Sequence, residues 1–211
     1  MKATLRRILE KAGVWHSLNF VRRIPAMIKW MAGGRKGPAP HPIKMRIVRS
    51  YLKKYGLTSF IETGTYMGDT LDYMSRTGVP CTSIELAENY YSKAKQKFGG
   101  RRNISLKLGN SGQVLPKLIR DVNSPVLFWL DGHYSGGKTA GKDEVNPVSA
   151  ELDAILQHPL KNHVILIDDA MLFTGEGGYP LLEDLVSYVS ANSEYSIDIK
   201  DDIIRLVPKT G

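Results

Sequence analysis

Acidic side chains follow the apolar runs of this sequence at five positions. Glu62 ends one run, Glu85 a second and Asp131 a third, and the pair Asp168 and Asp169 ends a fourth. Apolar runs of this length predict β-strands, and an open parallel sheet binds its ligands outside the carboxyl ends of its strands. Carboxylates at that edge can accept hydrogen bonds from hydroxyl groups or coordinate a hard cation. One such acid is readily explained as a helix cap, but five in the same setting predict a binding site.

The first run leads into a turn that contains two glycines, "ETGTYMGDT" (62–70). We expect Gly64 to permit a tight turn and the close approach of a ligand, and Gly68 to let the next helix pack near the sheet. The turn has neither the dinucleotide pattern G-x-G-x-x-G nor the pattern G-x-x-x-x-G-K-[ST], so phosphate binding is disfavoured there. Glu85, at the end of the second strand, can accept hydrogen bonds from two ribose hydroxyls. The predicted ligand is a nucleoside without a pyrophosphate.

Strand and helix patterns alternate between these acids. Strands are predicted over 58–63, 80–85, 104–109, 124–131 and 163–169, and helices over 43–56, 70–78, 88–99, 113–122, 149–159 and 180–192. This alternation predicts an α/β, Rossmann-like doubly wound sheet that is mostly parallel. Residues 195–208 read as two short strands across "KDD" and predict an antiparallel C-terminal hairpin.

The basic charge of the chain is concentrated at its N-terminus. Residues 1–54 contain 14 Lys and Arg residues and one acid, Glu10, for a net charge of +13, whereas residues 55–211 carry −5. Residues 1–40 are predicted to form a basic amphipathic helical extension in two pieces, the second bent or started by Pro25, followed by a Gly/Pro linker. Residues 41–211 are predicted to form the catalytic domain.

The extension carries Trp15, Phe20 and Trp30 and suits an anionic membrane surface or nucleic acid. The alternative is a helix that packs on its own domain, or on a second subunit in a homo-oligomer. The net negative charge of residues 55–211 argues against nucleic acid near an active site.

No stretch resembles a signal peptide or a membrane span, and Cys81 is the single cysteine, so an intrachain disulfide is excluded. We expect a cytoplasmic protein that can lie on the inner face of a membrane through residues 1–31.

Three stretches resemble a known family. The pattern E-x-G-x-Y-x-G at 62–68, the stretch "GNSGQVLPKL" (109–118) and the strand ends "FWLD" and "LIDD" are similar to class I S-adenosylmethionine-dependent methyltransferases. Within that group the similarity is greatest to metal-dependent O-methyltransferases of the catechol and macrocin type, over residues 58 to 207. The resemblance implies a seven-stranded sheet and binding of S-adenosylmethionine by Glu62, Gly64, Thr65, Tyr66, Gly68, Glu85, Asn110, Ser111 and Asp131.

The same resemblance implies a Mg²⁺ site made by Asp131, Asp168 and Asp169. Acids at the ends of neighbouring strands can converge on one hard cation, and without a cation they would repel one another. The alternative is a metal-free site, in which Asp131 touches the cofactor and one member of the pair caps a helix.

Methyl transfer to a hydroxyl needs a base and a dry site. His133, two residues past Asp131, is the best candidate for the base, although the relatives carry a lysine or histidine where this chain has Tyr134. Tyr134 and Lys138 therefore stay open as bases. The glycine-rich stretches 132–147 and 174–180 are candidate lids.

The acceptor is predicted to be a hydroxyl of a small molecule, a sugar or a lipid-linked glycan. Two other readings stay open at this point. One is a nucleic-acid-binding protein or RNA methyltransferase that uses the basic N-terminus, and the other is a non-catalytic relative that binds the cofactor.

Overall fold

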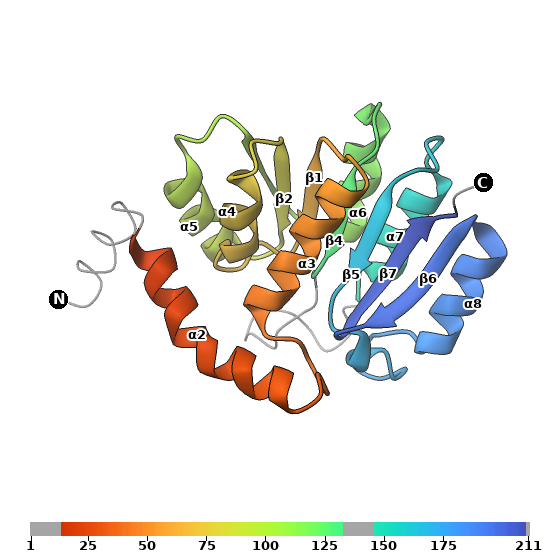
Figure 1. The fold of residues 1–211 in the computed structure, drawn as a ribbon. Coiled ribbons are helices and arrows are strands. Elements are labelled where there is room, and N and C mark those ends of the chain that lie inside the picture. The colour runs from red at the N-terminus through yellow and green to blue at the C-terminus, as the bar shows by residue number, and fades with distance from the viewer. Residues whose placement is uncertain (1–13, 133–145, 210–211) are drawn as a thin grey trace.

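The computed structural model describes residues 14–132 and 146–209, which build a seven-stranded sheet covered by helices (Figure 1). The strands are β1 (Phe60–Thr63), β2 (Cys81–Glu85), β3 (Ile104–Leu108), β4 (Leu127–Leu130), β5 (Val164–Ile167), β6 (Tyr195–Lys200) and β7 (Ile203–Pro208). Their order is β3-β2-β1-β4-β5-β7-β6. The strands from β3 to β5 are parallel, whereas β7 is antiparallel to both β5 and β6. The predicted fold class, including the C-terminal hairpin, is confirmed.

Helices cover both faces of the sheet. They are α2 (Val14–Ala32), α3 (His41–Lys54), α4 (Asp69–Ser75), α5 (Glu88–Phe98), α6 (Ser111–Leu118), α7 (Val148–Gln157) and α8 (Leu182–Asn192), with the 3-10 helices η1 (Ile119–Asp121) and η2 (Ala170–Leu172). Side chains of α3, α4 and α5 pack on one face, which includes Phe60 of β1. Side chains of α6, α7 and α8 pack on the other face, which includes Ile61 of β1. Successive residues of a strand point to opposite faces, so each central strand contributes to both cores.

The strand order reverses between β1 and β4, in the middle of the sheet. The chain runs outward from β1 to β3 and then returns to β4, and ligands of such sheets bind at the carboxyl ends beside this point. The backbone N–H of Asp131 donates to Thr63 O (3.2 Å), and that of Asp168 donates to Leu130 O (2.9 Å). These bonds fix the acids after β4 and β5 at the same edge of the sheet as the end of β1.

The turn between β6 and β7 consists of two acidic residues with left-handed backbones. Asp201 has φ 57° and Asp202 has φ 63°. Two consecutive residues of this conformation form the tight turn that matches the twist of a β-hairpin, and Asp tolerates it better than most residues. The hairpin returns the chain to the carboxyl end of β5, since Ala170 N donates to Asp202 O (3.1 Å).

The N-terminal extension forms one helix where it is described, and no second helix starts at Pro25. The helix α2 runs through Pro25 from Val14 to Ala32. Near its end, Met27 and Trp30 are buried, and the Trp30 indole donates to Gly37 O (3.2 Å). Trp30 therefore packs inside the protein, and this part of the helix follows the alternative in which the extension packs on its own domain. Contact with a membrane through residues 1–31 stays a prediction.

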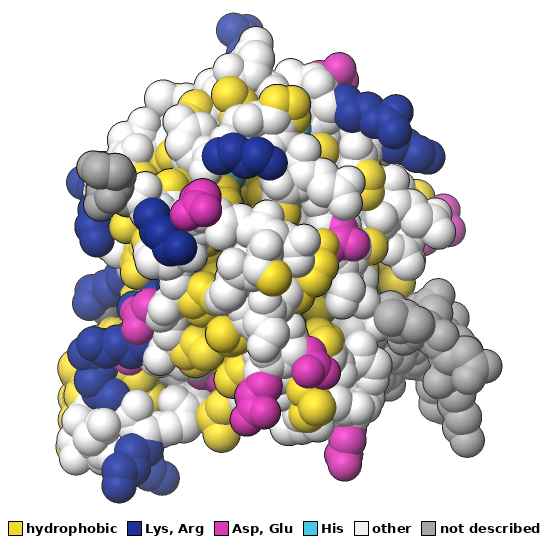
Figure 2. Space-filling model, turned by 90° about the vertical axis from the view of Figure 1, so that its right-hand side faces the viewer, with side chains coloured by type: hydrophobic (Ala, Val, Ile, Leu, Met, Phe, Trp, Pro, Cys, Tyr) yellow, Lys and Arg dark blue, Asp and Glu magenta, His cyan; other side chains and the backbone are white. Residues whose placement is uncertain are grey.

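Both signs of charge are spread over the face that carries β6 and α8. Lys and Arg side chains lie along the left edge and also at the top and upper right of this view, with Asp and Glu side chains among them and in the lower middle (Figure 2). This face presents no continuous basic surface. None of the described helices is both long and apolar enough to cross a bilayer.

Candidate functional site

The turn after β1 requires glycine at two positions. Gly64 has φ 82°, and a Cβ atom added to it would lie 2.2 Å from the carbonyl oxygen of Asp131. Gly68 has φ 68° and precedes α4, and a Cβ there would lie 2.7 Å from the ring of Phe98. The predicted tight turn is present. The close approaches that the structure shows are those of the β4 backbone and of α5.

Glu85 is fixed at the end of β2 by two backbone donors. Its Oε2 accepts a hydrogen bond from Tyr66 N (2.7 Å) and its Oε1 accepts one from Ala87 N (2.8 Å), while the side chain is buried. Each carboxylate oxygen has a further lone pair, so the group can also accept from two hydroxyls. The Tyr66 ring lies 4.8 Å from the Tyr90 ring and is exposed, on a backbone with φ 46°. Glu85 thus lies against the glycine turn at the end of β2, and its role in binding a ribose stays a prediction.

Glu62 lies under this turn rather than on its surface, with 1% of its area exposed. Ser83 Oγ donates to its Oε1 (2.7 Å), and Ser83 also shares a hydrogen bond with Thr65 Oγ1 (2.5 Å). Its Oε2 has no hydrogen-bond partner among the described residues. Burial raises the pKa of Glu62 to about 8, Ser83 opposes this, and the charges of Asp131 and Glu85 add to it.

The start of α6 supplies the predicted Asn110 and Ser111. The side chain of Asn110 caps the helix by accepting from Gly112 N (2.9 Å). Ser111 is buried. A Cβ added to Gly132 would lie 3.2 Å from Ser111 Oγ. The start of α6 therefore lies next to the backbone that follows Asp131.

Glu151 of α7 is a site residue that sequence reasoning missed. It is 1% exposed, and its Oε1 lies 3.2 Å from the position of a Cβ on Gly132. Burial raises the pKa of Glu151 to about 7, while the nearby hydroxyl groups of Ser111 and Thr63 oppose this rise. The sequence contained an indication that Glu151 is buried, because this acid lies on the apolar stripe of α7 with Val148, Leu152 and Ile155.

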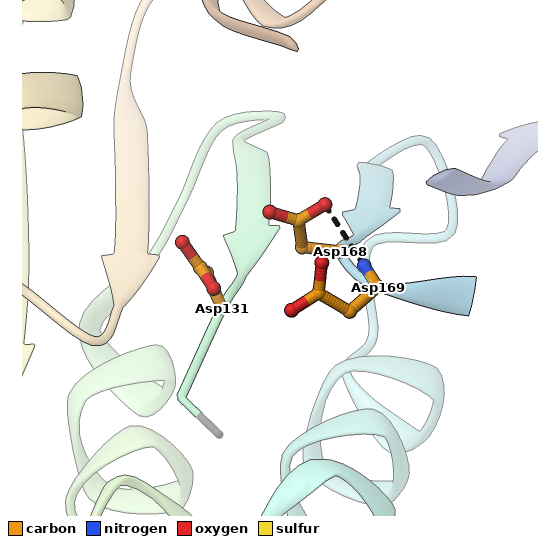
Figure 3. Close-up of side chains that lie close together, drawn as sticks. All are labelled: Asp131, Asp168 and Asp169. Carbon is orange, nitrogen blue, oxygen red and sulfur yellow. Dashed lines mark hydrogen bonds between the residues drawn. The ribbon is translucent and has the colours of Figure 1, made fainter. Parts of the chain in front are cut away.

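The acids after β4 and β5 form a cluster. Asp131, Asp168 and Asp169 each offer a carboxylate oxygen within 4.8 Å of the others, and Figure 3 shows Asp131 facing the pair. Asp169 has φ 54°, and its N–H donates to Asp168 Oδ1 (2.8 Å). Burial and then the charge of Asp131 raise the pKa of Asp168, while the charge of Lys44 opposes this rise. The predicted convergence of these carboxylates is present.

Lys44 of α3 is the second site residue that sequence reasoning missed. Its Nζ lies 2.5 Å from Asp168 Oδ1, 2.9 Å from Asp169 Oδ1 and 3.4 Å from Asp202 Oδ2. Burial disfavours the ammonium, but the charge of Asp168 and the hydrogen bonds that the ammonium donates to Asp168 and Asp169 raise the pKa of Lys44 overall. The cluster is therefore partly neutralised from within the chain.

A pocket lies beside this cluster. It is small and partly open to solvent, and its lining includes Asp131, Asn146, Glu151, Asp168, Phe173 and Tyr179. The rings of Phe173 and Tyr179 are 5.2 Å apart, and burial raises the pKa of Tyr179 to about 12. The pocket combines an aromatic wall with carboxylates.

Three carboxylates from two adjacent strand ends fit a hard divalent cation, which prefers oxygen ligands. The closest oxygen to Lys44 is Oδ1 in both members of the pair. Lys44 thus contacts the same two carboxylates that a metal ion would use.

The predicted base lies outside the described residues. His133, Tyr134 and Lys138 all fall in 133–145, so the choice among them stays a prediction. The same insert contains "GHYSGGKT" (132–139), which matches the letters G-x-x-x-x-G-K-[ST] and, apart from Gly132, also lies outside the described residues.

Solved structures of methyltransferases share this fold. An O-methyltransferase from Bacillus cereus in complex with SAH aligns with a TM-score of 0.59 and 13% identity, covering 88% of this chain and 90% of that chain. The O-methyltransferase TomG from Streptomyces achromogenes, involved in tomaymycin synthesis and solved with SAM, gives 0.57 and 15%, covering 89% and 88%. The SAH-bound methyltransferase PaMTH1 from Podospora anserina gives 0.58 and 14%, covering 88% of each chain. No family model and no curated protein matches the sequence. The chain thus has the class I methyltransferase fold, as the resemblance of its motifs predicted.

Proposed function

We propose that the protein is an S-adenosylmethionine-dependent O-methyltransferase that uses Mg²⁺ or another divalent cation. The observation that carries this proposal is the row of acids along one edge of the sheet. Glu85 ends β2 and Glu62 lies near the end of β1, while Asp131 and Asp168 directly follow β4 and β5, and these four strands are neighbours in that order. One end of the row suits a ribose and the other suits a cation, with a pocket beside it.

The cofactor would lie over the carboxyl ends of β1 and β2. Glu85 would accept hydrogen bonds from the ribose hydroxyls, and the backbone from Gly64 to Tyr66 would approach the cofactor closely because Gly64 lacks a side chain. Asn110 and Ser111, at the start of α6, would border the adenine. The structural relatives solved with SAM or SAH support this assignment at the level of the fold.

Asp131, Asp168 and Asp169 would hold the cation. A bound divalent ion lowers the pKa of a coordinated hydroxyl and fixes its oxygen for attack on a methyl carbon. The pocket lined by Phe173 and Tyr179 would exclude water from the acceptor. Exclusion of water favours this transfer, because the positive sulfonium and the negative oxygen neutralise each other on the way to the transition state. The acceptor would be a hydroxyl of a small molecule, a sugar or a lipid-linked glycan.

The proposal is tested by calorimetric titration of S-adenosylhomocysteine into the wild-type protein and the variant Glu85→Gln. Loss of hydrogen bonds to a charged acceptor is worth roughly 1.5 to 3 kcal/mol, so the variant should bind roughly 10- to 100-fold more weakly. Glu88→Gln is the matched control, since Glu88 is exposed three residues further along. Equal affinities of the wild-type protein and Glu85→Gln, or no binding by the wild-type protein, would reject the nucleoside site. Release of S-adenosylhomocysteine with a panel of hydroxyl acceptors and Mg²⁺ then tests the transfer.

A further inference from the structure

Lys44 occupies a position that is locally unfavourable for a cation. It lies in the first turn of α3, which contains no acidic residue, and it is 6% exposed. The N-terminus of a helix carries a partial positive charge, and burial of an ammonium group is costly. A lysine is stable in this place only because groups from elsewhere in the chain compensate its charge.

These groups come from two separate parts of the fold. Asp168 and Asp169 follow β5, and Asp202 lies in the turn between β6 and β7. Asp202 is itself held in place, because its Oδ1 accepts a hydrogen bond from Met171 N (2.9 Å). The ammonium group therefore sits in a preformed arrangement of carboxylates rather than on a mobile surface pair.

We propose that the Lys44 ammonium is a resident cation of the acidic cluster, which competes with a divalent ion for the pair Asp168 and Asp169. This inference deepens the proposed function and rests on it for the presence of the divalent ion. A Mg²⁺ ion bound to these carboxylates would lie about 2.1 Å from its ligand oxygens. Lys44 Nζ is already 2.5 and 2.9 Å from oxygens of the same two groups, so the two cations would repel each other at close range.

The consequence is a cluster with moderate affinity for metal. In the metal-free protein, Lys44 neutralises one of the negative charges and holds the carboxylates of Asp168 and Asp169 close together. The repulsion among Asp131, Asp168 and Asp169 is thereby reduced in the metal-free protein. Removal of the positive charge should leave a site that binds a divalent ion more tightly.

The test is direct measurement of Mn²⁺ binding by electron paramagnetic resonance of the free ion at pH 8. The wild-type protein is compared with Lys44→Met, Lys44→Gln and Lys53→Met. Lys53 is an exposed lysine of the same helix, so its replacement removes the same charge at a distance from the cluster. We expect the dissociation constant for Mn²⁺ to fall at least about tenfold in both Lys44 variants and to be unchanged in Lys53→Met.

Unchanged or weaker Mn²⁺ binding in the Lys44 variants would overturn the inference, and so would the absence of binding in all four proteins. Weaker binding would show that Lys44 orients the carboxylates for the ion instead of competing with it. Thermal unfolding shows whether each variant is folded, and Lys44→Gln, which retains a hydrogen-bond donor, decides the question if Lys44→Met does not fold. Titration of S-adenosylhomocysteine into the same samples separates the two proposals. Cofactor binding without the expected Mn²⁺ response rejects the role of Lys44 alone, whereas loss of cofactor binding by the wild-type protein rejects the proposed function.

Discussion

The two ends of the candidate site are held by different kinds of contact. At the β1–β2 end, Glu85 is fixed by backbone N–H groups of Tyr66 and Ala87, at sequence separations of 19 and 2. At the β4–β5 end, Asp169 is paired with Lys44, at a sequence separation of 125. The first end is built by one turn and its neighbouring strand. The second end depends on the docking of α3 and of the hairpin turn.

Because of this difference, we expect the two ends of the site to be sensitive to different kinds of substitution. Backbone donors are fixed once the turn is folded, so the β1–β2 end should respond chiefly to changes of shape. The β4–β5 end contains buried acids whose pKa values are raised, that of Glu151 to about 7 and that of Asp168 against the opposing charge of Lys44. Such groups are costly to ionise, so that end should respond chiefly to charge and pH.

The strongest effect is expected from a change of shape in the β1 turn. Gly64→Ala would place a Cβ 2.2 Å from Asp131 O on a backbone with φ 82°. The left-handed conformation and the overlap together should lower the free energy of unfolding by roughly 3 to 4 kcal/mol, measured by urea denaturation. Because the overlap is with the backbone of β4, a side-chain rotation cannot relieve it.

Gly78→Ala is the matched control. Gly78 has a similar φ of 86°, but no described atom lies within 4 Å of the added Cβ. It should lose only about 1 kcal/mol, from the backbone conformation alone. Similar losses in the two variants would mean that the contact with Asp131 does not shape the turn.

At the other end, the sharpest change should come from charge removal at Glu151. The pKa of Glu151 is about 7 in the folded protein, above its ordinary value of 4.5. The folded state therefore holds this proton more tightly than the unfolded state, so the contribution of Glu151 to stability is fully present below pH 4.5 and is lost as the pH rises through about 7. One pKa unit corresponds to about 1.4 kcal/mol, which makes ionised Glu151 cost about 3 kcal/mol at pH 8.

Glu151→Gln should therefore raise the free energy of unfolding by about 2 kcal/mol at pH 8.5 and have little effect at pH 4.5, since the amide keeps some cost of burial. Urea denaturation at the two pH values measures both. Glu183→Gln, which changes an exposed acid of α8, should alter neither. A gain that is the same at both pH values would show that ionisation of Glu151 is not its source.

The sequence was sufficient to predict the fold and the position of Glu85 at the β1–β2 end of the candidate site. Alternating strands and helices predicted the sheet, and the acids at the strand ends predicted which carboxylates would share an edge. Glu85 could be placed because its partners, Tyr66 and Ala87, belong to segments that the same local pattern defines. The helix boundaries were less accurate. The helix predicted from residue 43 begins at His41, where Pro42 occupies the first turn.

Lys44 and Glu151 could not be assigned from local patterns, because their partners lie far away in the chain. Each nevertheless interrupts the apolar pattern of its own helix. Lys44 precedes the buried Val48 and Leu52 at intervals of four, and Glu151 stands on the apolar stripe of α7. A charged residue on an apolar stripe indicates a buried partner but does not say which, since that depends on how the helices dock.

The smallest effect is expected at Asn110, where shape and ligand contact can be separated. Its side chain caps α6 through Gly112 N (2.9 Å), and removal of such a cap costs about 1 kcal/mol. Asn110→Ala should lose this amount in urea denaturation, whereas Asn110→Asp should retain it because a carboxylate oxygen caps equally well. If Asn110 also borders the adenine, both variants should bind S-adenosylhomocysteine more weakly, since Asp lacks the amide donor. Weaker binding by Asn110→Ala alone would mean that the cap positions α6 and that the β1–β2 end recognises the nucleoside without this side chain.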